Sequence, residues 1–110
     1  MKKILLLSDT HGHLDSKITK YVDQADEVWH AGDIGKIEVL DGLEALKPTR
    51  AVYGNIDGNK VRLQAPEVLS FSCEGVRVLM THIAGYPGRY TPQARTLISQ
   101  YKPKLFICGH

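Results

Sequence analysis

Six side chains that can bind metal ions stand where five short apolar segments end. Carboxylate, amide and imidazole groups, with few thiols, suit divalent ions such as Mn²⁺, Fe²⁺, Zn²⁺ or Ni²⁺. In an open α/β sheet the carboxyl ends of parallel strands border one crevice, so residues far apart in the sequence can converge there. The sequence therefore predicts one metal site built from Asp9, His11, Asp33, Asn55, His82 and His110.

Short apolar runs predict the strands that carry these side chains, and helical spacing of apolar residues predicts the segments between them. Two strands separated by Cys73-Glu74-Gly75 indicate an antiparallel hairpin, so the expected fold class is α/β with a mixed sheet. The predicted strands are Ile4–Ser8, Glu27–Ala31, Arg50–Tyr53, Glu67–Ser72, Val76–Met80 and Leu105–Cys108, and the predicted helices are Asp15–Gln24, Ile34–Leu46 and Pro92–Tyr101.

Length and composition are typical of one small globular domain. The chain has 110 residues, 43% hydrophobic and 24% charged, with a formal net charge of +2. It is too apolar for a disordered chain, and no basic run is long enough to suggest duplex nucleic acid as a partner. The apolar run Ile4–Leu7 is too short for a signal peptide, and no stretch is long enough to cross a membrane. We therefore expect a cytoplasmic domain with no membrane partner.

Each candidate residue, taken singly, also has a structural explanation. Asp33 can cap the helix predicted after it, Asn55 can form a turn, and a lone histidine at a strand end is usually structural. However, all five histidines lie in or beside strand-end segments and none lies in a predicted helix, which favours a shared site. We expect His30 to pack within its strand and Cys108 to pack in the core.

In order along the chain, Asp9-x-His11, Gly32-Asp33, Gly54-Asn55-x-Asp57, the strand-end His82 and Gly109-His110 resemble the motifs of the calcineurin-like metallophosphoesterase superfamily. The resemblance covers essentially the whole chain. It is strongest with the small bacterial and archaeal phosphodiesterase branch, which includes the retromer subunit vacuolar sorting protein 29. It implies an α/β/β/α sandwich and two divalent ions, with Mn²⁺ expected and Fe, Ni, Zn or Mg as alternatives.

The resemblance also implies the roles of the ligands. Asp9 and His11 hold the first ion, Asp33 bridges both ions, and the second ion is held by Asn55, His82 and His110. In such a dinuclear centre the pKa of a bridging water falls, and the resulting hydroxide attacks phosphorus while the ions and the amide neutralise the phosphoryl charge.

Other residues would support this reaction. Asp33 and Asn55 are the candidate catalytic residues, and Asn55 also contacts the substrate. His13 and Asp57 are expected to orient the metal ligands. Arg89 is a candidate for contact with a substrate phosphate.

The chain departs from the family pattern at three points. Ile56 stands where many members carry a general-acid histidine, which favours substrates with good leaving groups. Ile83, rather than glycine, follows His82. The final Gly-His-x-His motif stops at His110, so we expect residues 1–110 to be one metallophosphoesterase domain that is incomplete at its C-terminus.

The predicted function is metal-dependent hydrolysis of a small, nucleotide-like or otherwise activated phosphodiester, by a protein that can form homo-oligomers. The alternative is a catalytically weak or inactive protein-binding scaffold of the same fold. All six candidate positions keep coordinating side chains, which a vestigial site would have lost. A nucleotide-binding domain without metals is disfavoured, because no glycine-rich phosphate loop follows the first strand; the segment there is Asp9-Thr10-His11-Gly12-His13.

Overall fold

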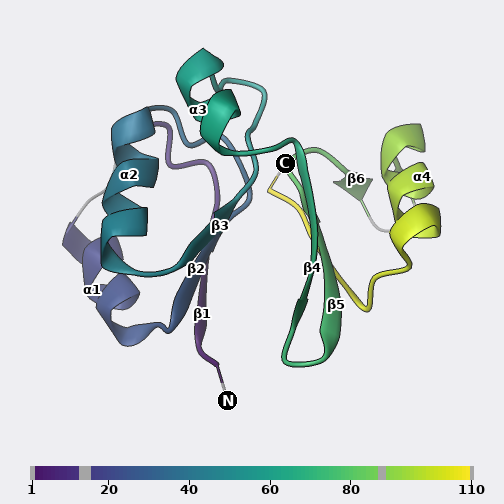
Figure 1. Ribbon diagram of the computed structural model, residues 1–110. Coiled ribbons are helices and arrows are strands. Elements are labelled where there is room, and N and C mark those ends of the chain that lie inside the picture. Colours follow the sequence, from purple (N-terminus) through teal and green to yellow (C-terminus); the bar gives the residue numbers. More distant parts are fainter. Residues whose placement is uncertain (1, 13–15, 87–88, 110) are drawn as a thin grey trace.

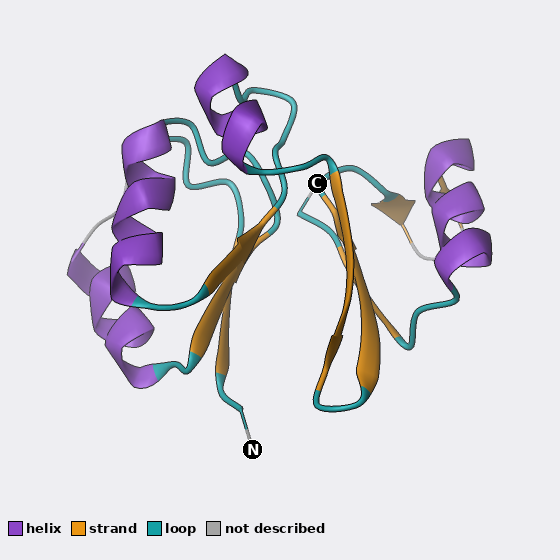
Figure 2. Cartoon of the chain, in the orientation of Figure 1, coloured by secondary structure: helices purple, strands orange, loops and turns teal. Residues whose placement is uncertain are grey.

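Two three-stranded sheets face each other and carry helices on their outer sides, which gives four layers in the order α/β/β/α (Figure 1). The computed structural model describes residues 2–12, 16–86 and 89–109. Two helices cover the first sheet, and another lies beyond the second sheet (Figure 2). The predicted α/β class, with its four layers and mixed strand directions, is confirmed.

The first sheet is parallel, with its strands in chain order. Its central strand is buried along its whole length, because helices cover one face and the second sheet covers the other. Leu7, His30 and Ala51 pair across the sheet, so the three strands end at nearly the same level. Its elements are β1 (Ile4–Leu7), α1 (Ser16–Gln24), β2 (Glu27–His30), α2 (Ile37–Leu46) and β3 (Thr49–Ala51).

The second sheet is mixed, because β5 is antiparallel to β4 and parallel to β8. Glu74 and Gly75 form the tight β4–β5 turn with φ of 48° and 80°, the left-handed values that two-residue hairpins favour. Cys73 pairs with Val76 and so extends the strand beyond the prediction. The elements are β4 (Val68–Cys73), β5 (Val76–Thr81), β6 (Gly85–Tyr86), β7 (Arg89–Tyr90), α4 (Pro92–Tyr101) and β8 (Leu105–Ile107).

Alternating side chains on the strands build two apolar cores. Val28 packs between the first sheet and its helices, together with Leu40 and Leu43. The next residue, Trp29, points the other way and packs with Met80 between the two sheets. Successive residues of β2 therefore contribute to both cores, one on each face of the first sheet.

Besides the bounds of the strands, several features differ from the sequence prediction. Helix α2 begins at Ile37 rather than Ile34, since the preceding residues include positive φ angles that no helix accommodates. The short helix α3 (Asn59–Gln64) and the β6–β7 hairpin are too brief to show periodicity in the sequence. Cys108 is exposed rather than in the core, because Ile107 takes the inward position of this strand. No helix in the described residues is long and apolar enough to span a membrane.

Candidate metal centre

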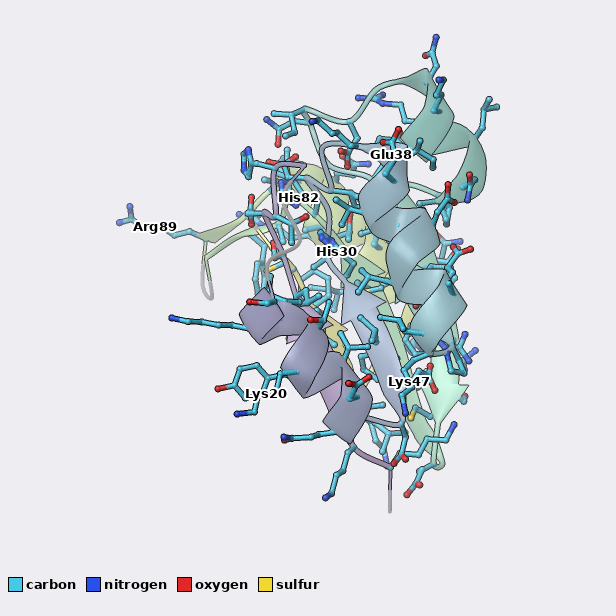
Figure 3. All side chains as sticks on the ribbon, turned by 90° about the vertical axis from the view of Figure 1, so that its left-hand side faces the viewer. Lys20, His30, Glu38, Lys47, His82 and Arg89 are labelled. Carbon is cyan, nitrogen blue, oxygen red and sulfur yellow. The ribbon has the colours of Figure 1, made fainter. Side chains whose placement is uncertain are left out.

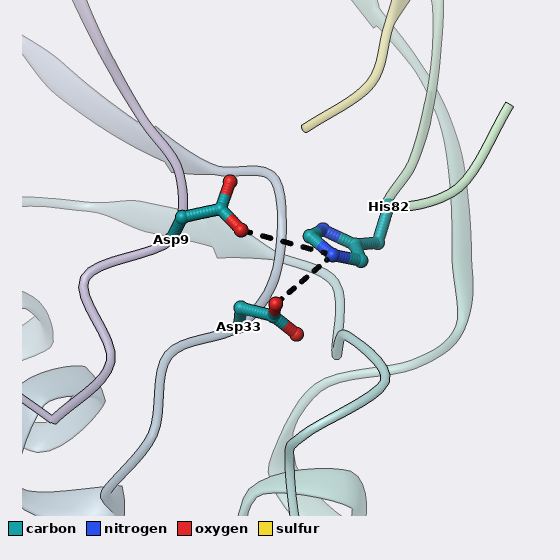
Figure 4. A group of neighbouring side chains, drawn as sticks. All are labelled: Asp9, Asp33 and His82. Carbon is teal, nitrogen blue, oxygen red and sulfur yellow. Dashed lines mark ion pairs between the residues drawn. The ribbon is translucent and has the colours of Figure 1, made fainter. Parts of the chain in front are cut away.

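Asp9, Asp33 and His82 come together at the carboxyl ends of three strands (Figure 4). One ligand atom from each lies within 4.8 Å of the others. The His82 Nε2 atom is 3.3 Å from Asp33 Oδ2 and 3.9 Å from Asp9 Oδ1. Two carboxylates and one imidazole directed at one point are a donor set that fits a divalent cation.

Backbone contacts between the loops hold this group in place. The Asp9 N–H donates to the Gly32 carbonyl at 2.9 Å, which ties the loop after β1 to the loop after β2. Asp9 and Asp33 both adopt left-handed backbone angles, with φ of 55° and 56°. Such angles are uncommon outside glycine and gather at functional sites, where the surrounding structure enforces them.

The orientation of His82 follows from its second ring nitrogen. Nδ1 lies 2.7 Å from the Ala31 carbonyl, which can only accept, so Nδ1 carries a proton and Nε2 is the ring nitrogen that faces the two carboxylates. The ring packs directly on Gly32, where an added Cβ would lie 2.5 Å from His82 Nδ1. Gly32 is therefore required here for space.

His11 joins the same group from the exposed side. Its Nε2 atom is 3.6 Å from Asp9 Oδ1 and 3.8 Å from Asp33 Oδ2. Asp33 Oδ2 therefore faces both His11 and His82, while Asp33 Oδ1 accepts from the Ile56 N–H at 3.2 Å. Asp33 does not cap α2, because the N-cap of that helix is Lys36.

Asp57 joins the loops that follow β2 and β3. Its buried carboxylate accepts backbone N–H groups from Ile34 at 3.1 Å, Gly35 at 2.7 Å and Gly54 at 2.8 Å. The residue thus fixes the backbone on both sides of the site, which fits the orienting role that we predicted. Gly54 packs against Asp33, since a Cβ at that position would overlap the Asp33 carboxylate.

His30 is fully buried and hydrogen-bonded through both ring nitrogens. The Gly32 N–H donates to Nδ1 at 3.1 Å, so the proton is on Nε2, which lies 3.0 Å from Thr10 Oγ1. Thr10 in turn donates to the Ile34 carbonyl. Burial lowers the pKa of His30 to about 4. As predicted, His30 packs within the fold.

The electrostatic environment keeps Asp9 ionised. Partial burial by itself raises the pKa of Asp9, but a hydrogen bond from Ser8 and the nearby His82, with further contributions from Asp33 and His11, outweigh it. The net pKa lies below the usual value for aspartate. A carboxylate is therefore present for a cation near neutral pH.

A cavity of about 180 Å³ opens beside this group, and both His82 and Asn55 line it. Glu67 and Gln93 also line it. No sequence signal indicates this, because both residues lie within segments predicted as regular strand and helix. Arg89 is exposed on β7 and projects away from His82 (Figure 3). Its contact with substrate stays a prediction.

Two predicted site residues, His13 and His110, lie outside the described residues. The described residue nearest to the second of them is Gly109, whose N–H donates to the His82 carbonyl at 3.0 Å. This bond brings the chain after β8 to the loop after β5. Of the six predicted ligands, Asp9, His11, Asp33 and His82 gather within ion-pair distance, and Asn55 borders them through the cavity.

An α/β/β/α sandwich with carboxylates and imidazoles at one sheet edge defines an α/β domain with a group of side chains that could hold a metal ion. The model of the calcineurin-like phosphoesterase superfamily domain matches residues 1–110. The chain belongs to this superfamily.

Individual relatives agree with that assignment. A protein of Methanothermobacter thermautotrophicus described as "Probable metallophosphoesterase" is 29% identical over 110 residues, which are 96% of this chain and 63% of the relative. An archaeal phosphodiesterase structure superposes with a TM-score of 0.72 at 24% identity, covering 96% and 71% of the two chains. Vps29 of Chaetomium thermophilum superposes with a TM-score of 0.76 at 12% identity, covering 98% and 60%. At these identities the two structures show the shared fold, and the chain spans less than two thirds of the Methanothermobacter protein and of Vps29.

Proposed function

We propose that the protein is a metal-dependent phosphodiesterase with a dinuclear centre, acting on a small, nucleotide-like or otherwise activated phosphodiester. The observation that carries this proposal is the position of Asp33 Oδ2, 3.3 Å from His82 Nε2 and 3.8 Å from His11 Nε2. A carboxylate with two imidazoles within this distance could serve two cations at once. Mn²⁺ is the ion that we expect first.

The residues divide this work by position. Asp9 and His11 would hold one ion, His82 and Asn55 would hold the other with His110, and Asp33 would contact both. Two bound ions lower the pKa of a water and neutralise phosphoryl charge. Asn55, on the wall of the cavity, would donate its amide N–H to a phosphoryl oxygen.

The surroundings of the site bear on the substrate and on the compartment. Ile56 follows Asn55 and cannot donate a proton to a leaving group, which favours activated esters. Cys73 and Cys108 are free thiols, which fits a reducing compartment such as the cytoplasm.

The decisive test is Mn²⁺-dependent hydrolysis of bis(p-nitrophenyl) phosphate, with p-nitrophenyl phosphate alongside, by the wild type and by Asp33→Asn. We expect diester hydrolysis by the wild type and a loss of at least about 100-fold in the variant. An asparagine still accepts from the Ile56 N–H but lacks the charge that two cations need, so the fold should persist. Asp23→Asn, an exposed position on α1, is the matched control.

Full activity in Asp33→Asn would contradict the bridging role. A wild type that binds metal stoichiometrically and hydrolyses neither ester would instead support the alternative, a protein-binding scaffold of the same fold.

A further inference from the structure

The cavity beside His82 extends from the candidate metal-binding group, Asp9, Asp33 and His82, toward the start of α4. Its walls come from Tyr53 after β3, Glu67 before β4, Thr81 at the end of β5 and Gln93 in α4. Its volume is about 180 Å³. Pockets for drug-sized ligands occupy roughly 300–1,000 Å³, so this cavity suits a single ring rather than an extended ligand.

Glu67 is held rigidly in this wall although it is exposed to solvent. The Tyr53 hydroxyl donates to Glu67 Oε2 at 3.2 Å, and Gln93 Nε2 donates to Glu67 Oε1 at 3.0 Å. The Thr81 hydroxyl donates to the Glu67 main-chain carbonyl at 3.4 Å. Groups from three different segments therefore fix both oxygens of the carboxylate and its backbone.

The side chains that line the cavity favour a ligand group with hydroxyls over one with a further phosphate. Each Glu67 oxygen has a further lone pair besides the one that already accepts a hydrogen bond. It can therefore accept a second hydrogen bond, from a hydroxyl group of a ligand. The described residues that line the cavity include no lysine or arginine to offset the carboxylate. A further phosphate near Glu67, beyond the one that His82 and Asn55 would contact, would meet an uncompensated negative charge.

We propose that this cavity binds an uncharged, hydroxyl-bearing ester group of the substrate, such as a nucleoside sugar, and that Glu67 determines specificity against a further phosphate on that group. This inference rests on the proposed function, which places the phosphorus at the group containing His82. His82 belongs to both sites, since its Nε2 faces the carboxylates and it also lines the cavity. An ester group of a phosphodiester bound there is directed along the wall toward Glu67.

The test compares two chromogenic diesters, thymidine 5′-(p-nitrophenyl phosphate) and the same compound with a 3′-phosphate. We expect the wild type to prefer the first, and Glu67→Gln to narrow that preference by about 5- to 10-fold, mainly through KM. Glutamine keeps the size and can still accept from either Tyr53 or Gln93, so the change removes the charge and at most one of the two hydrogen bonds. Glu44→Gln, on the exposed face of α2, removes the same charge far from the cavity and should leave the preference unchanged.

An unchanged preference in Glu67→Gln, or an equal shift in Glu44→Gln, would overturn the inference. Absence of hydrolysis by every protein would count against the proposed function instead. In that case, binding of nucleosides measured by NMR tests the inference about the cavity. Thymidine should shift the backbone amide resonances of Glu67 and Gln93 in the wild type, whereas thymidine 3′-monophosphate should do so at lower concentration in Glu67→Gln than in the wild type. Shifts elsewhere only, or equal binding of the monophosphate by both proteins, would also overturn it.

Discussion

At the scale of single residues, the site is held by polar contacts that cross from one loop to another. The Asp57 carboxylate accepts three backbone N–H groups, and His82 is oriented by the Ala31 carbonyl. These bonds fix loops that would otherwise lose conformational entropy when a cation binds. The Asp9–Asp33–His82 group is therefore preorganised, and it would need little rearrangement to bind a cation.

Ile56 is the residue whose replacement should change the chemistry most selectively. Its side chain is 47% exposed beside Asn55, while its N–H is already bound to Asp33. In Ile56→His, an imidazole at this position can donate a proton to the leaving oxygen. We expect kcat/KM for alkyl leaving groups to rise about tenfold or more, with little change for p-nitrophenolate, measured over a series of diesters. An equal change across the series, or the same pattern in Ile56→Gln, would show that proton donation is not the cause.

At the scale of elements, an ion cluster around the buried Glu27 joins β2 and β3 at the edge opposite the candidate metal centre. Glu27 accepts from Trp29 Nε1 and Arg50 Nε, both at 2.9 Å, and from Lys2 Nζ at 3.3 Å. The Arg50 guanidinium also lies 4.2 Å from the centre of the Phe71 ring on β4. The cluster therefore connects the two sheets as well as two strands.

This cluster predicts how stability depends on pH. Burial alone would raise the pKa of Glu27, but hydrogen bonds from Trp29, Arg50 and Lys2 hold it below its ordinary value. Since the folded pKa is the lower one, the stabilisation is complete above the unfolded pKa and is lost as the pH falls through the folded pKa. Glu27→Gln should lower the free energy of unfolding by about 1–3 kcal/mol at pH 7. It should also make that free energy fall less steeply as the pH is lowered from 7 to 3, measured by urea unfolding. If the free energy of unfolding of the variant fell as steeply toward low pH as that of the wild type, this assignment would be contradicted.

At the scale of the whole molecule, the metal-binding group draws on both sheets. Asp9 and Asp33 follow strands of the first sheet, and His82 follows β5 of the second. A cation bound between them would link the two sheets directly. Because the unfolded chain has no such site, binding should stabilise the fold.

Metal should therefore raise the melting temperature. At an Mn²⁺ concentration 100 times the Kd, the expected gain is about 2.7 kcal/mol, or on the order of 10 °C for a domain of this size. A chelator should reverse the gain, and His82→Ala should abolish it in differential scanning calorimetry. A melting temperature that does not respond to Mn²⁺, Zn²⁺ or Ni²⁺ would argue against a metal centre in this chain.

Much of the fold and of the site could be predicted from local sequence. Apolar runs of strand length, turn residues between them and Thr91-Pro92 at the start of α4 are short-range signals that the structure reproduces. The positions of Asp9, Asp33 and His82 at strand ends were equally local, because a ligand at a strand end needs only the strand before it to be recognised.

Tertiary structure alone decided what surrounds those residues. The starting point of α2 depends on the Asp57 carboxylate, which accepts hydrogen bonds from the backbone of residues 34 and 35, 23 and 22 positions away along the sequence. The cavity depends on Tyr53, Glu67 and Gln93, which no periodicity connects. The sequence by itself determined which side chains can bind metal and which strands present them, because those are properties of short segments. Which neighbours orient the ligands and form the cavity wall was decided by the packing of the two sheets, because hydrogen bonds between distant segments exist only in the folded chain.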